Sequence, residues 1–592
     1  MRDLRRTALW LGLIGSASFL SLSAMAQTAT HDSPGAAEPV LAQSPAEPSF
    51  HDVVAEPVPD QEKATHHAIP LPEPAPVVLE TADRKPEPAI DIPLPEAAPV
   101  TALMQQDMLR LTVEGLLADE AAMRDLRLST KEREGLRAFY AQAQRPLAWA
   151  SDGAFTREAM GAIARLKAAD EDGLDPTDYP VPDVKLRKEA APGQWAEADL
   201  KLSASVIRYA RDARGGRIEP SRLSPLVTPV LALPEADEVL GKVAFAKDAN
   251  AALASYNPPH PGYRALKEKL AELRASHPSQ PSVHVPKGPA LRVGMKDPRV
   301  PLIRARFNLN EDDDNRNVYD KRLSTAVAAF QKEKGLQGNG ILTAQTVAAL
   351  SGPSLAQREA NLIANMERWR WLPEDLGKRH IMVNVPEFRL QLVDSGKVAH
   401  ETRVIVGKEQ SQTPIFSEDM KYLVVNPSWT IPPSIMKKEI LPGLANDPDY
   451  AARRGYTVIR KGGRLIVQQP PGERNALGFV KFMFPNKHAV YLHDTPNRNL
   501  FTAAKRAFSH GCVRVEKPFE LAEFIMGEDS KWDEKKLRSL IGKGERTVFL
   551  PKPLPVHLAY FTLAVDEKGS LRSYTDLYGL DQKVRAALNL AQ

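Results

Sequence analysis

The chain has a single cysteine among its 592 residues, Cys512, and therefore cannot form an internal disulfide. Aromatic residues make up only 6% of the sequence, and the net charge is a modest +4. No dense basic stripe with interleaved aromatics is present, which argues against a nucleic-acid-binding surface. Beyond residue 26, no run is long and apolar enough to span a bilayer. The remaining composition is typical of globular proteins, and the length predicts three or more domains.

The first 26 residues have the pattern of a secretory signal peptide. Three arginines within the first six residues precede an apolar run over 8–22, and Ala24-Met25-Ala26 follows. This order predicts export, with cleavage after Ala26. The alternative is an uncleaved anchor in the inner membrane, because residues 7–26 just reach the length of a span. A lipid-anchored lipoprotein is excluded, since no cysteine lies near Ala26.

Residues 27–100 carry 15 of the 50 prolines and show neither a helical nor a strand period. Such a segment buries too little apolar surface to offset its chain entropy, so we expect a disordered spacer. His66 and His67 lie within it, and we interpret them as solvated side chains rather than metal ligands. We predict no metal site and no cofactor elsewhere in the chain.

Two helical regions follow the spacer. Residues 101–285 have a helical period and no evident chemistry, so we interpret them as a scaffold. Residues 286–353 predict a compact three-helix unit, with Gly335 ending the second helix and Thr343 beginning the third. In this unit Leu302, Ile303 and Phe307 are expected on one helical face, and Val327 and Phe330 on another. The acidic loop 311–314 lacks the alternating ligands of a calcium site and reads as solvated.

The pattern changes from helical to alternating after a connecting helix over 354–378. Residues 379–550 predict a mostly-β domain, in which Asp394-Ser395-Gly396 forms a hairpin turn. A Pro/Gly-punctuated insertion at about 434–478 precedes the reactive residues, and we hypothesise that it covers them as a lid. A hairpin and helix over 551–592 are expected to return to the scaffold. The predicted fold is therefore multidomain α+β.

The residues around Cys512 are those that a cysteine acyl transferase needs. A thiol requires a nearby base, and His493 ends an apolar strand on the face opposite Val490 and Leu492. His510 is too close in sequence to serve well as the base and is the better orienter. The N–H groups of Gly511 and Cys512 are candidate oxyanion donors, and Arg514, on the same strand face as Cys512, could hold a substrate carboxylate.

The run His493-Asp494-Thr495 with Ser509-His510-Gly511-Cys512-Val513-Arg514 resembles the signature of the L,D-transpeptidases, which have a YkuD-type catalytic domain. Three further runs, over residues 365–373, 426–433 and 481–486, resemble the larger Gram-negative members. The 286–353 unit resembles a peptidoglycan-binding module. The similarity runs from about residue 105 to the end. One departure is Asp494, which stands where the family pattern usually has Gly or Ser.

The resemblance implies a periplasmic enzyme with Cys512 as nucleophile, His493 as base and Ser509 in the catalytic motif. It implies that Arg514, Asp494, Trp429 and Tyr491 contact substrate. The implied partners are tetrapeptide stems of peptidoglycan, as both donor and acceptor, and the implied state is a monomer. It also implies acylation of Cys512 by carbapenem-type β-lactams.

The implied reaction releases D-alanine and joins two diaminopimelate residues through a thioester. L,D-carboxypeptidation, anchoring of a lipoprotein and a non-enzymatic wall-binding role remain alternatives. A papain-like protease is disfavoured, because the cysteine-bearing helix of that class is missing near the start of the mature chain.

Overall fold

The computed structural model describes residues 100–591 apart from 144, 187, 277–284, 310–314, 463 and 528–530. The predicted signal peptide, the proline-rich spacer with His66 and His67, and the acidic loop 311–314 therefore lie outside the described residues. In the part that is described, no helix is long and apolar enough to cross a membrane.

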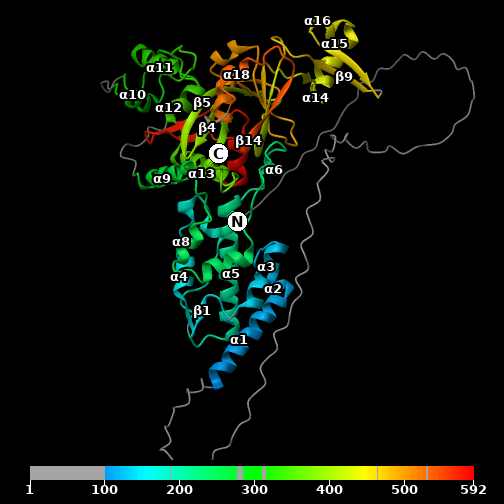
Figure 1. Cartoon of the computed structure of the whole chain (residues 1–592). Helices are drawn as coiled ribbons and strands as arrows, with labels where there is room; N and C mark the ends of the chain where they lie inside the picture. Colours follow the sequence, from blue (N-terminus) through cyan, green and yellow to red (C-terminus); the bar gives the residue numbers. More distant parts are fainter. Residues whose placement is uncertain are drawn as a thin grey trace, which may run out of the picture. The chain divides into compact units, whose positions relative to one another are not determined.

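The scaffold region is helical, and its elements are coloured from blue to green in Figure 1. Its helices are α1 (Val100–Ala118), α2 (Glu120–Asp125), α3 (Thr130–Gln142), α4 (Arg157–Lys167), α5 (Pro192–Gly215), α6 (Pro220–Leu223), α7 (Ala236–Ala244), α8 (Ala249–Ala254) and α9 (Pro261–Ala275). A small hairpin joins β1 (Ala150–Ser151) and β2 (Ala154–Phe155), and two 3-10 turns cover Ala169–Asp172 and Pro176–Asp178. Helix α5 is central, because alanines, serines and apolar residues on several of its faces are buried.

The three-helix unit forms as predicted, with α10 (Val300–Arg306), α11 (Lys321–Glu333) and α12 (Ala344–Ser351). Thr343 caps α12 by accepting a hydrogen bond from the Thr346 N–H, and Gly335 adopts a positive φ just after α11. The prediction that Leu302 faces the core with Ile303 is wrong, because Ile303 is fully buried whereas Leu302 is exposed. Consecutive helical residues point about 100° apart, so the two cannot share one core-facing position.

The catalytic region is a nine-stranded sheet ordered β12-β5-β13-β11-β10-β6-β14-β3-β4, and an additional β4–β5 pairing closes it into a barrel. Its strands are β3 (Arg379–Asn384), β4 (Arg389–Asp394), β5 (Lys397–Gly407), β6 (Phe416–Val425), β10 (Val480–Met483), β11 (Leu492–His493), β12 (Ala507–Ser509), β13 (Val513–Val515) and β14 (Arg546–Ala559). Helices α17 (Pro518–Met526) and α18 (Glu534–Arg538) pack on it. Ser395 and Gly396 both adopt a positive φ in the predicted hairpin turn, which joins β4 to β5.

The insertion forms a separate cap, labelled α14, α15, α16 and β9 in Figure 1. It holds α14 (Pro433–Ile435), a π-helical turn (Met436–Ile440), α15 (Leu441–Asn446), α16 (Tyr450–Arg453) and the sheet β7 (Trp429–Thr430), β9 (Arg464–Gln469) and β8 (Thr457–Lys461). Ile431, Ile440 and Val467 are buried together in a core of their own. The cap is therefore a small packed unit rather than a loop.

The expected boundary at residue 550 is wrong, because it falls inside β14. This strand pairs with β6 at its start and with both β6 and β3 near its end, so residues 551–559 belong to the barrel. Beyond it lie the hairpin β15 (Leu563–Val565) and β16 (Leu571–Ser573) and the helix α19 (Leu580–Ala587). Leu563 packs with Tyr263 and Leu266 of α9, so this end of the chain does return to the scaffold.

Helix α13 (Leu355–Trp369) joins the scaffold to the barrel through buried polar groups. Glu367 is fully buried and accepts hydrogen bonds from the N–H groups of Arg217 and Ile218. Arg370 donates to the Asp172 carbonyl at 2.5 Å and to the Tyr263 hydroxyl at 3.0 Å. On the other side Asn365 accepts from the N–H groups of Thr562 and Leu563. Since a buried charge without partners is costly, these contacts fix the helix to both regions.

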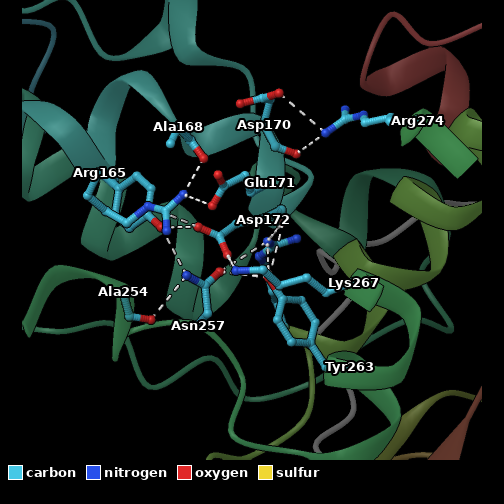
Figure 2. A network of polar contacts seen from close by, with 12 residues as sticks. Arg165, Ala168, Asp170, Glu171, Asp172, Ala254, Asn257, Tyr263, Lys267 and Arg274 are labelled. Atoms are coloured by element: carbon cyan, nitrogen blue, oxygen red, sulfur yellow. Dashed lines mark hydrogen bonds and ion pairs between the residues drawn. The ribbon is translucent and has the colours of Figure 1, made fainter. Parts of the chain in front are cut away.

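Figure 2 shows the scaffold side of this joint, centred on Asp172. The carboxylate of Asp172 is almost fully buried and binds Lys267 at 2.5 Å and the Tyr209 hydroxyl at 2.6 Å. Arg165 lies 3.4 Å from the same carboxylate. Two cations and a hydroxyl thus compensate one buried anion, which is the arrangement that makes a buried ion pair tolerable.

Two buried histidines, His260 and His557, should make the stability of the joint depend on pH. Burial lowers the pKa of both His260 and His557 to about 4. A pKa that is lowered in the folded state contributes stability above the unfolded value of about 6.5, which is lost as pH falls toward 4.

We therefore expect Tm to fall between pH 6.5 and pH 4, and His557→Gln to remove up to about 3 kcal/mol of that pH dependence. Thermal unfolding of both proteins at several pH values measures the difference. Parallel Tm curves for the wild type and the variant would contradict the assignment.

Candidate active site

Three neighbouring strands place three basic side chains in one row. In the register of the sheet, Lys481 of β10 pairs with His493 of β11, and His493 pairs with Arg514 of β13. Directly paired residues on adjacent strands share a face, so the three side chains lie side by side. Val480, Phe482 and Leu492, which alternate with them, are buried in the barrel core. Cys512 directly precedes β13 and so stands at the end of this row.

The thiol of Cys512 is held by Tyr491. Both the backbone N–H and the hydroxyl of Tyr491 hydrogen-bond the sulfur, while Lys481 and Arg514 act on it electrostatically. Burial outweighs these contacts and raises the pKa of the Cys512 thiol. The resting nucleophile is therefore the protonated thiol, which needs a base to remove its proton.

His493 is suited to that task because it is neutral. Burial, together with the charges of Arg514 and Lys481, lowers the pKa of His493 to about 3. Its Nδ1 lies 2.5 Å from the Asp494 carbonyl oxygen, which fixes the proton on Nδ1, and the backbone of Leu477 is a further hydrogen-bond partner of the ring. The ring meets that of Tyr491 edge-on, with centroids 5.7 Å apart. The histidine, the tyrosine and the thiol thus form one cluster.

The turn before the cysteine is held by Ser509. The Ser509 hydroxyl donates to the Cys512 carbonyl at 2.5 Å and accepts from the Gly511 N–H at 3.1 Å. Gly511 has φ 121°, a conformation that disfavours a side chain. The expectation that the Gly511 N–H serves as an oxyanion donor is therefore wrong for this conformation, because Ser509 already uses it. No pattern in the sequence indicated that the Ser509 side chain would fold back onto this turn.

Asp494 does not face a substrate site, contrary to expectation. Its carboxylate is buried, accepts from the Phe479 N–H at 2.9 Å and pairs with Arg498 at 2.8 Å. A Cβ built on Gly478 would lie only 2.4 Å from this side chain. Asp494 therefore anchors the entry to β10, and its carbonyl orients His493.

The cap reaches the cluster at two points. Trp429, at the start of β7, hydrogen-bonds the Tyr491 hydroxyl. Glu439, in the π-helical turn, binds His510 with its Oε1 2.8 Å from Nε2. His510 is thus turned toward the cap, which fits an orienting role better than that of a base. Glu439 had no recognisable signal in the sequence, because its place beside His510 depends on how the insertion folds.

Lys481 is the second residue that sequence reasoning missed as a functional group. Its Nζ lies 4.1 Å from the Tyr491 ring centroid, a cation–π contact. Burial lowers the pKa of Lys481, and the charge of Cys512 partly offsets this. Arg514 was expected to bind substrate. Burial also lowers the pKa of its guanidinium, and its Nε has no hydrogen-bond partner among the described residues. The sequence pattern could have pointed to Lys481. Alternation along residues 480–483 places Lys481 on the strand face opposite Phe482, just as it places His493 on the face opposite Leu492.

Comparison with known proteins agrees with this site. Residues 378–548 match the family model of the L,D-transpeptidase catalytic domain. Over these residues the chain is similar to the L,D-transpeptidases. Residues 134–270 match a scaffold domain and residues 301–350 a peptidoglycan binding domain. These matches confirm the resemblance on which the sequence interpretation rested.

A curated relative from Haemophilus influenzae, named as an L,D-transpeptidase, is 32% identical over 275 residues, which is 43% of this chain. The match covers 55% of that relative's length. Among solved structures, an L,D-transpeptidase from Xylanimonas cellulosilytica is 16% identical over 46% of this chain and 99% of its own, with TM-score 0.15. A cysteine-to-serine mutant of the Enterococcus faecium L,D-transpeptidase is 15% identical over 31% of this chain and 50% of its own, with TM-score 0.15. The two structural scores are too low to carry an argument.

The position of Lys481 predicts an effect on thiol reactivity. Lys481→Met removes a cation that favours the thiolate, so we expect the pKa of Cys512 to rise further and its alkylation at pH 7 to slow about tenfold. Lys481→Arg keeps the charge and serves as the matched control. The measurement is the rate of iodoacetamide labelling against pH, read by mass spectrometry; coincident profiles for Lys481→Met and the wild type would count against this role.

Proposed function

We propose that this protein is a cysteine L,D-transpeptidase that forms direct diaminopimelate–diaminopimelate cross-links in peptidoglycan of the periplasm. The observation that carries the proposal is the clustering of the only thiol with a neutral histidine and two half-buried cations in a matched L,D-transpeptidase catalytic domain. The peptidoglycan binding domain at 301–350 supports a wall substrate.

In the first step His493 Nε2 takes the thiol proton, and Cys512 Sγ attacks the carbonyl of the third residue of a donor stem. The amide C–N bond then breaks, and the departing D-alanine amine takes the proton from His493. In the second step the side-chain amine of an acceptor stem attacks the thioester, gives its proton to His493 and releases the thiolate. The thioester conserves the energy of the broken amide, so the scheme requires no nucleotide.

The charged neighbours have defined tasks in this scheme. Lys481 and Arg514 offset the negative charge that develops on sulfur when the thiol is deprotonated. Arg514, with its unpaired Nε, is the proposed partner of a stem carboxylate. Tyr491 and Trp429 position the sulfur through their hydrogen bonds. Because Ser509 uses the Gly511 N–H, the Cys512 N–H remains the proposed oxyanion donor.

The reaction is tested by incubating the protein with disaccharide-tetrapeptides and analysing the products by mass spectrometry. We expect a dimer whose mass equals two substrates minus one free alanine, and we expect Cys512→Ala to abolish it. Tripeptide without dimer would instead identify an L,D-carboxypeptidase. A product-free reaction with no carbapenem adduct on Cys512 would leave the wall-binding role.

We further propose that the cap acts as a lid latched by Glu439 and His510. The cap has its own core and meets the cysteine motif through this exposed pair. An exposed ion pair contributes up to about 1 kcal/mol, which corresponds to about a fivefold change in an equilibrium.

Glu439→Gln should therefore speed labelling of Cys512 by a bulky maleimide up to about fivefold, with little effect on iodoacetamide. Glu473→Gln, which changes an exposed acid elsewhere in the insertion, is the matched control. Both rates are followed by mass spectrometry. Equal maleimide rates in the three proteins would disprove the latch.

A further inference from the structure

One buried arginine of the scaffold stands apart from the others. Six arginines are buried among the described residues: Arg165, Arg208, Arg299, Arg304, Arg368 and Arg370. Five of them bind carboxylates or carbonyl oxygens. Arg208, on α5, is only 8% exposed, and no hydrogen bond or ion pair of its side chain occurs among the described residues. A buried guanidinium without an anion is unfavourable, so this exception calls for an explanation.

The neighbouring carboxylate, Asp212, offsets the burial of the Arg208 charge only in part. Asp212 follows one helical turn later on α5, but its two oxygens accept hydrogen bonds from Arg211 at 2.9 Å and from the Tyr179 hydroxyl at 3.0 Å. Arg211 in turn binds Glu132 at 3.1 Å. Asp212 and Glu132 thus accept hydrogen bonds from other donors, while Arg211 and Arg127 add positive charge beside Arg208.

Arg208 lines a cavity of about 670 Å³ between α1, α2, the 177–180 turn and α5. The exposed cations Arg127 and Lys201 also line this cavity, as do the exposed acids Asp125 and Glu197. Met123 and Leu200 provide apolar wall between them. The volume is that of a small-molecule or peptide site, and one buried cation with polar groups nearer the solvent is a usual lining for such a site.

We propose that this cavity binds the carboxylate of a short peptide that also carries an ammonium group, with Arg208 as the carboxylate partner. The guanidinium fork matches a carboxylate in geometry, and Asp125 and Glu197 can receive the ammonium. If the proposed function is correct, on which this identity rests, the ligand is a second peptidoglycan stem bound away from the catalytic cluster. The scaffold is then a substrate-holding domain.

The test is hydrogen–deuterium exchange of the full chain carrying Cys512→Ala, with and without disaccharide-tetrapeptide. We expect slower exchange in peptides covering residues 122–128 and 196–210. With Arg208→Met added, at least a tenfold higher ligand concentration should be needed for the same protection. Arg208→Lys should require a smaller increase. Protection of peptides from 480–515, which reports the catalytic site separately, should be the same in all three proteins.

Two controls keep the proposal falsifiable. Without ligand, Arg208→Met should leave Tm unchanged or raise it, because it removes an uncompensated buried charge; a marked fall in Tm would show a structural role and overturn the proposal. The proposal would also be overturned if the ligand did not protect residues 122–128 and 196–210 from exchange. It would equally be overturned if Arg208→Met kept the full protection. Protection by inorganic phosphate but not by the tetrapeptide would overturn the peptide assignment. Turnover by the protein with intact Cys512 is measured independently, so a failed cross-linking reaction is distinguishable from a failed scaffold site.

Discussion

The chemistry of this protein depends on desolvation at the junction of β10, β11 and β13. Burial favours the uncharged forms of the thiol and the imidazole, so Cys512 and His493 rest as a neutral pair rather than as a thiolate–imidazolium pair. The same burial makes Lys481 and Arg514 unusually effective, because charges act more strongly where water is excluded. The sulfur thus becomes nucleophilic only when its proton is removed, a condition that limits side reactions of the single cysteine.

The second constraint is mechanical, and it lies in α13. This helix presents Glu367 and Arg370 to the scaffold and Asn365 to the segment after β14. Each of these groups is buried and bonded to backbone atoms of a distant segment, so none can move without leaving a partner unsatisfied. The scaffold and the barrel are therefore joined by directional polar contacts rather than by apolar packing alone, and any ligand held on α5 has a rigid connection toward the barrel.

Much of this arrangement could be predicted from the sequence, because periodicity and turn residues are local signals. The barrel hairpin at Ser395, the cap of α12 at Thr343 and the face of His493 opposite Leu492 all followed from alternation or capping rules. Leu302 was misplaced because the sequence pattern does not show which of two adjacent apolar residues, Leu302 or Ile303, points into the core. The boundary at 550 was misplaced because β14 continues through three prolines that the pattern treats as an end.

The site itself was predictable in its residue types but not in its partners. The motif around Cys512 predicted roles for Cys512, His493 and Arg514, yet the use of the Gly511 N–H by Ser509 and the burial of Asp494 depend on three-dimensional closure. Glu439 and Arg208 carry no sequence signal at all. Each becomes notable only through its surroundings: Glu439 because it contacts His510, and Arg208 because its buried side chain makes no hydrogen bond or ion pair with the described residues.

The long strand β14 also has a consequence for the order in which the protein folds. It lies between β6 and β3, pairing Val556 with Ile381, so the barrel can close only after the chain has been synthesised at least as far as this strand. Pairings so distant in sequence are slow to form. The strands that carry Lys481, His493 and Cys512 must therefore wait, incompletely packed, for a segment that emerges later. A chain that ends before residue 546 would lack this strand, and its thiol would stand in an unclosed barrel, open to oxidants.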